Sequence, residues 1–118
     1  MKYKLKLATI IAGDIDESIS FYRDILGFEM VERFYNETGG LVLMQSPDGA
    51  AVELIDSKSF ETGFWSIGME VDDFEEAIED LRAKECSFIW EPATLPLGKL
   101  AAIEDPNGVK VVVLKMNE

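Results

Sequence analysis

The chain repeats itself at an offset of 59 residues, and this repeat limits its fold more than any other feature. The clearest copies are residues 41–56 and 100–115, where two apolar runs flank a Pro-x-Gly turn. Pro47 in the first copy matches Pro106 in the second. Proline and glycine suit a tight turn, and the flanking runs are rich in Val, Leu and Ile, as strands are. Each copy therefore predicts a β-hairpin.

The same repeat extends over the residues before each hairpin. Asp14 and Asp73 each stand three residues before a Glu, which is the spacing of a capping box at the start of a helix. Apolar residues then recur at helical spacing, and Gly27 predicts the end of the first helix. The apolar stripe of this helix is Ile15, Ile19, Tyr22 and Leu26. Strands are predicted over 3–11, 28–35, 64–71 and 86–91, in addition to the two hairpins.

Each copy thus reads βαβββ, so the predicted fold is α+β with two tandem modules. Module one is expected over residues 1–56, a linker over 57–63, and module two over 64–118. About 55 residues bury little surface on their own, so the two modules should form a single domain of 118 residues.

Composition excludes several classes of function. The net charge of −12 opposes binding to nucleic acid and to anionic membranes. The chain has no histidine, which removes the common Ser-His and Cys-His nucleophile systems and the usual nitrogen ligands of zinc, iron and nickel. Its one cysteine, Cys86, cannot form an internal disulfide, so the expected location is the cytoplasm. No apolar run approaches the roughly 20 residues that span a bilayer.

The first helix and the last hairpin together resemble the vicinal oxygen chelate superfamily. The helix segment is GDIDESISFYRDILGF over 13–28, and the hairpin segment is EDPNGVKV over 104–111. This superfamily includes glyoxalase I, extradiol dioxygenases, the fosfomycin and bleomycin resistance proteins, and related epimerases. The resemblance implies that the two modules form curved mixed sheets around a cup, and that the protein is a homodimer.

The resemblance also implies four positions for metal ligands, two in each module. They are Leu7, Glu53, Ser66 and Val112 in this sequence. Leucine and valine cannot coordinate a cation, and serine is a poor substitute for imidazole. A single carboxylate makes a weak site, because affinity grows with ligand charge and number. We therefore expect no metal and no other cofactor.

Glu53 is the chemically distinctive residue of the repeat, because its counterpart is Val112. It alternates with Val52 and Leu54, so it faces the cup if those two face the helices. Two interpretations stay open: a solvated carboxylate or relic of a lost metal site, and a ligand-binding or proton-accepting group. The candidate ligand-binding residues are Leu7, Thr9, Glu53, Ser66, Gly68, Trp90 and Val112.

Two further features are expected around the cup. Phe88 and Trp90 alternate on one predicted strand, so they share a face, as either an aromatic wall of the cup or an ordinary core pair. The loops over 36–40 and 92–98 occupy equivalent places in the two modules and gate the cavity.

The leading hypothesis is a metal-independent small-molecule-binding protein, similar to the bleomycin resistance proteins and used to sequester a drug or toxin. Its expected ligand is a small organic molecule. The carboxylate of Glu53 suits a cationic ligand. The alternative is a glyoxalase-like lyase or isomerase that uses Glu53 as its catalytic base or has a rearranged metal site. A structural or regulatory protein with an empty cup is a third class.

Overall fold

The computed structural model describes residues 2–36, 39–96 and 98–117 of the chain. It contains eight strands and confirms the α+β fold class and the βαβββ order of each module. Within these described residues, no helix is long and apolar enough to cross a membrane.

The chain divides into two compact units, which are described one at a time. Residues Leu7–Trp65 form one unit, here called the β1–β4 unit. Residues Met1–Lys6 and Ser66–Glu118 form the other, here called the β5–β8 unit. The first three residues of strand β1 (Lys4–Ala12) therefore belong to the β5–β8 unit, although the strand is continuous.

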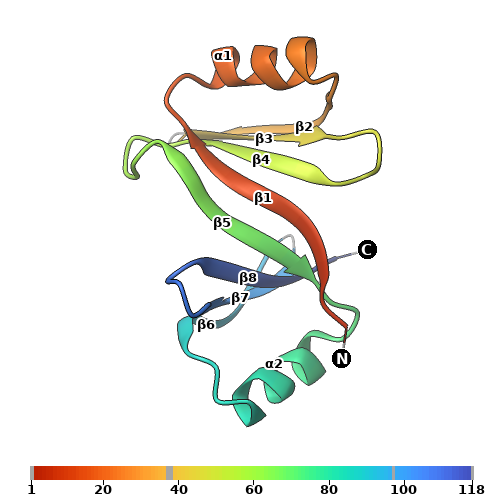
Figure 1. Ribbon diagram of the computed structural model, residues 1–118, viewed down its shortest axis with the longest axis vertical. Helices are drawn as coiled ribbons and strands as arrows, with labels where there is room; N and C mark the ends of the chain where they lie inside the picture. Colours follow the sequence, from red (N-terminus) through yellow and green to blue (C-terminus); the bar gives the residue numbers. More distant parts are fainter. Residues whose placement is uncertain (1, 37–38, 97, 118) are drawn as a thin grey trace. The chain divides into compact units, whose positions relative to one another are not determined.

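The β1–β4 unit has a four-stranded mixed sheet with one helical segment on one face (Figure 1). Its strand order is β2-β3-β4-β1; β1 runs parallel to β4, and the other neighbours are antiparallel. The elements after β1 are α1 (Ile15–Ser20), the π-helical turn η1 (Phe21–Ile25), β2 (Glu29–Asn36), β3 (Gly39–Gln45) and β4 (Ala51–Asp56). The β3–β4 hairpin confirms the first predicted hairpin.

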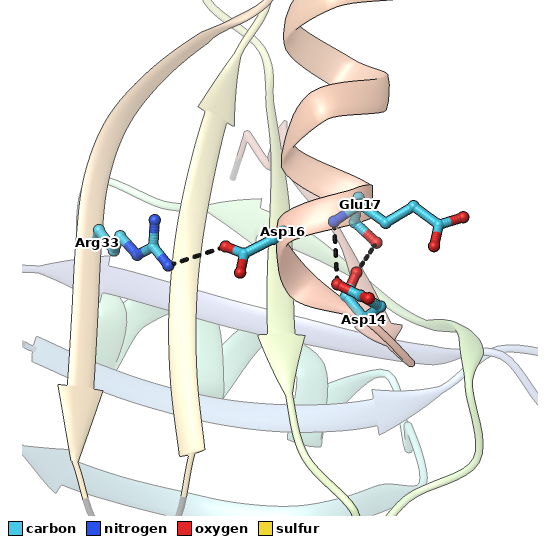
Figure 2. Close-up of polar contacts among 5 residues, drawn as sticks. Asp14, Asp16, Glu17 and Arg33 are labelled. Atoms are coloured by element: carbon cyan, nitrogen blue, oxygen red, sulfur yellow. Dashed lines mark hydrogen bonds and ion pairs between the residues drawn. The ribbon is translucent and has the colours of Figure 1, made fainter.

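Helix α1 starts where the sequence predicts. The Asp14 carboxylate accepts a hydrogen bond from the Glu17 backbone N–H at 3.0 Å, which caps the helix (Figure 2). Arg33 of β2 forms an ion pair with Asp16 at 3.3 Å, which links the helix to the sheet (Figure 2). Ile15 and Ile19 are buried against the sheet, in a cluster with Ala12, Val42, Met44 and Leu54.

The end of this helix differs from the prediction. The last turn is π-helical, which adds one residue to the turn and shifts the apolar stripe around the helix axis. Leu26 is therefore 47% exposed rather than buried. Gly27 has a φ of 77°, so the predicted glycine stop is confirmed.

The β5–β8 unit repeats this plan. Its strand order is β5-β8-β7-β6, with β5 parallel to β8 and the other neighbours antiparallel. Its elements are β5 (Gly63–Glu70, whose first three residues belong to the β1–β4 unit), α2 (Phe74–Ala83), β6 (Phe88–Leu95), β7 (Gly98–Glu104) and β8 (Lys110–Met116). The Asp73 carboxylate caps α2 by accepting from the Glu76 backbone N–H at 3.0 Å. The core of this unit packs α2 on one sheet face, through Val71, Phe74, Ala77, Ile78, Leu81, Ala101 and Val113.

Strand β6 is where the sequence prediction was least accurate. It continues to Leu95, so most of the predicted loop over 92–98 is strand. Pro92 is tolerated because β6 pairs with β7 alone within this unit, as an edge strand. In the other unit, β2 reaches Asn36 and β3 begins at Gly39, so the predicted loop over 36–40 is also mostly strand. Residues 37, 38 and 97 of these loops lie outside the described residues.

Candidate functional site

The sheet of the β1–β4 unit has one face covered by α1 and a second face, here called the helix-free face. Val52 and Leu54 of β4 pack in the cluster under α1. Because side chains alternate along a strand, Glu53 points to the helix-free face. Its neighbour across the parallel β1–β4 ladder is Thr9, and its neighbour across the β3–β4 ladder is Leu43. These three residues form a row across three strands.

Thr9 and Glu53 interact directly. The Thr9 hydroxyl donates a hydrogen bond to Oε1 of Glu53 at 2.9 Å. Thr9 is buried, and Glu53 is partly buried. Among the described residues, Thr9 is the hydrogen-bond partner found for this carboxylate.

The surroundings of Glu53 favour its neutral form. Burial raises the pKa of its carboxyl above the ordinary value, and the hydrogen bond from Thr9 partly opposes this shift. The residues that share this face explain the raised pKa, because a carboxylate among apolar side chains loses much of its hydration. Those on β1, β3 and β4 are Leu7, Ile11, Leu41, Leu43, Ala51 and Ile55, together with the polar Gln45.

The β5–β8 unit has an equivalent row without the polar pair. Gly68 stands where Thr9 does, and Val112 stands where Glu53 does. Val112 is paired with Gly68 on one side and Ala102 on the other, and Trp90 is the partner of Ala102 on β6. The repeat has thus kept the backbone arrangement in both units but placed a hydrogen-bonded carboxylate in one of them.

The seven predicted site residues divide between these two rows and the strands that carry them. Leu7, Thr9 and Glu53 lie on the helix-free face of the β1–β4 unit. Gly68, Trp90 and Val112 lie in the second row, and the buried Ser66 is two residues before Gly68 on the same strand face. That all seven meet in one cup stays a prediction.

The predicted aromatic wall is wrong. Phe88 packs against the core under α2, whereas Trp90 pairs with Ala102 on the opposite face of the sheet. The reason is a register shift between Phe88 and Trp90, which cancels the alternation that the sequence pattern assumed. The Trp90 ring instead faces the ammonium of Lys110, which lies 4.8 Å from the ring centroid. Burial lowers the pKa of Lys110.

A hollow beside the Glu53 row escaped the sequence prediction. It has a volume of about 370 Å³, and its apolar lining comes from Phe34, Leu41, Ile55 and Phe60. Ile55 is the next residue after Glu53 on the same strand face, and Leu41 is its register partner. Strand alternation and hairpin pairing are signals that indicate these two residues. Phe60 comes from the linker, which carries no comparable signal.

The residues present do not fit the metal that the resemblance implies. Of the four expected ligand positions, Leu7 and Val112 offer no donor atom, and Ser66 offers a neutral hydroxyl. Oε1 of Glu53 already accepts the Thr9 hydroxyl. Among the residues that the structure describes, no group of three Asp, Glu or Cys side chains is placed to hold a metal ion.

Comparisons with known proteins agree with this fold. The chain is 28% identical over 118 residues to a probable lactoylglutathione lyase of Synechocystis, covering 90% of each protein. It is 31% identical over 111 residues to the lactoylglutathione lyase of Haemophilus influenzae, covering 84% of this chain and 82% of that protein. The structure of methylmalonyl-CoA epimerase from Mycobacterium tuberculosis matches with a TM-score of 0.82 at 20% identity, covering 98% of this chain and 89% of that one.

A protein-family model also matches most of the chain. The model of the Glyoxalase/Bleomycin resistance protein/Dioxygenase superfamily matches residues 4–113, which is nearly the whole chain. The matched range includes both modules and the Thr9–Glu53 pair. The chain therefore belongs to the Glyoxalase/Bleomycin resistance protein/Dioxygenase superfamily.

Proposed function

We propose that this chain is a metal-independent small-molecule-binding protein, and that Glu53 is the polar anchor of its ligand. The observation that carries the proposal is the Thr9–Glu53 pair on an apolar sheet face. One carboxylate oxygen is held by Thr9, and in this proposal the other accepts a hydrogen bond from a donor on the ligand. The apolar side chains around the pair supply contact area, as in most small-molecule sites.

The acceptor-rich pair defines the class of ligand. An ionised Glu53 presents an acceptor and no donor, and Thr9 already uses its one proton. An ammonium, amidinium or hydroxyl group on the ligand would supply the missing donor, and a cation would also neutralise the charge. A thermal-shift screen of small amines and neutral organic compounds tests this proposal. We expect hits among donors, and smaller shifts with Glu53→Gln, which keeps the shape and removes the charge.

A second candidate function is catalysis by Glu53 as a general base. Two observations favour it: burial raises the pKa of Glu53 towards the range useful for proton transfer, and the curated relatives are lactoylglutathione lyases. In such an isomerisation Glu53 would take a proton from one carbon of the substrate and return it to the neighbouring carbon. Turnover of the methylglyoxal–glutathione adduct by EDTA-treated protein, lost in Glu53→Gln, would support catalysis over binding alone.

We also propose that the protein is a homodimer. Strand β2 is the edge strand of its unit, and several of its apolar side chains are about half exposed: Met30, Val31 and Tyr35. Edge strands with apolar side chains tend to pair with another chain. Sedimentation at micromolar concentration should give twice the chain mass of 13.2 kDa. A single species at the chain mass would contradict the proposal.

A further inference from the structure

The hollow beside the Glu53 row lies in the β1–β4 unit, and Phe34, Leu41, Ile55 and Phe60 are the apolar residues of its lining. Phe34 is 46% exposed and Phe60 is 52% exposed, which is unusual for rings that serve a core. The Phe60 ring is held in place by Trp65, at a centroid distance of 5.5 Å. This linker residue is therefore positioned rather than loose.

The hollow lies next to the Glu53 row, because Leu41 and Ile55 line it. Ile55 follows Glu53 by two residues on the same face of β4, which is a distance of about 7 Å along a strand. Leu41 and Leu43 repeat this step on β3, as the register partners of Ile55 and Glu53. Leu41 and Leu43 thus form an apolar floor between the carboxylate and the hollow. The lining of the hollow also includes the polar residues Asp56, Ser57 and Ser59.

The size of the hollow suits a ring. Its volume is about 370 Å³, whereas a closed cavity of about 150 Å³ is enough to hold benzene. The walls offer two aromatic rings and two aliphatic side chains, and aromatic pairs add to the contact energy of a bound ring.

We infer that the hollow formed by Phe34, Leu41, Ile55 and Phe60 binds the apolar body of a ligand whose donor group pairs with Glu53. The ligand class is an amine or related donor joined to an aromatic or bulky aliphatic group, with the two parts about 7 Å apart. This inference rests on the proposed function, because Glu53 fixes one end of the ligand. It adds a second subsite and a required spacing.

The experiment compares two probes by isothermal titration calorimetry: butylamine, which has no ring, and 4-phenylbutylamine, which has one. In the wild-type protein, we expect 4-phenylbutylamine to bind about fivefold more tightly or better, because its ring leaves water for the hollow. Phe60→Ala should remove most of this advantage, measured as the ratio of the two dissociation constants. Phe60 is a half-exposed linker residue, so the variant should fold.

The control is Phe21→Ala, which truncates another half-exposed phenylalanine of the same unit. Phe21 lines a separate hollow beside α1, so this variant should keep the full advantage of the ring. The inference fails if the wild-type protein shows no preference for the ring or binds neither amine. It also fails if the preference persists in Phe60→Ala.

The same titrations separate this inference from the proposed function. Glu53→Gln should weaken the binding of both amines. If it does, but Phe60→Ala preserves the preference for the ring, the subsite is overturned and the anchor is supported. If Glu53→Gln binds both amines as tightly as wild type, the anchor is overturned, and with it the two-part ligand inferred from it.

Discussion

Gly39→Ala and Gly98→Ala should each destabilise the protein by at least ~3 kcal/mol, the largest stability effect that we expect from a single added methyl group. Each glycine opens the second-last strand of its module, at equivalent positions of the repeat. Their φ angles are 142° and 159°, which few other residues adopt. A Cβ at Gly39 would overlap the Asp56 carbonyl oxygen, and one at Gly98 would overlap that of Lys115. Backbone atoms of a paired strand cannot move aside without breaking the ladder.

Gly49→Ala is the matched control for steric overlap. Gly49 has a φ of 96° in the turn of the first hairpin, but a Cβ there would meet nothing within 4 Å. This variant should show conformational strain alone, at ~1–2 kcal/mol. Urea unfolding of the three variants measures the difference. Equal losses for Gly39→Ala and Gly49→Ala would contradict the close strand packing described here.

Glu53→Gln should raise the melting temperature at neutral pH while weakening ligand binding. Burial raises the pKa of Glu53 in the folded protein above the ordinary value of about 4.5, which the unfolded chain has. The stability that this group contributes is therefore fully present below the unfolded pKa. It is lost as the pH rises through the folded pKa, because the buried carboxylate must then ionise. Glutamine carries no such penalty.

The raised pKa of Glu53 predicts how the stability of Glu53→Gln depends on pH. The melting temperature of Glu53→Gln should exceed that of wild type at pH 7, and the gap should close as the pH falls towards 4. Glu32→Gln is the control, because Glu32 pairs with Leu43 in the same row but is exposed on the edge strand. It should show a much smaller change. A Glu53→Gln protein that is less stable than wild type at pH 7 would mean that the charged carboxylate stabilises the fold.

Thr9→Val tests how the carboxylate is positioned. Valine keeps the shape of threonine but removes the donor that bonds to Glu53 at 2.9 Å. The pKa of Glu53 should rise further, because the hydrogen bond opposes the effect of burial. An NMR titration of the Glu53 side chain reports this directly, and Thr9→Ser should restore the wild-type value. An unchanged pKa in Thr9→Val would exclude this positioning role.

The sequence predicted the fold well because the repeat and the local signals agreed. Two hairpins with proline turns, two capping aspartates and one glycine stop all point to the same βαβββ plan. Two of the errors occur where a single residue is added. A π-helical turn rotated Leu26 outwards, and a register shift in β6 separated Phe88 from Trp90. Neither irregularity can be recognised from the hydrophobic pattern, because both depend on packing between segments that are distant in the chain.

The candidate site was predicted in part for similar reasons. Strand alternation correctly predicted that Glu53 faces away from the helix, because its neighbours Val52 and Leu54 are clearly apolar. Its pairing with Thr9 depends on the register of two parallel strands that are more than 40 residues apart, which local pattern does not specify. Phe60 reaches the hollow from an irregular linker, so no periodic signal marks it.

We propose that Glu53 anchors a ligand without a metal. The most direct test is to titrate EDTA-dialysed protein with 4-phenylbutylamine, with and without added Ni²⁺ or Zn²⁺, and to repeat the titration with Glu53→Gln. We predict that the affinity of the wild-type protein does not depend on the metal, and that Glu53→Gln binds at least several-fold more weakly. Binding that requires added metal, or that is unchanged in Glu53→Gln, would contradict the claim.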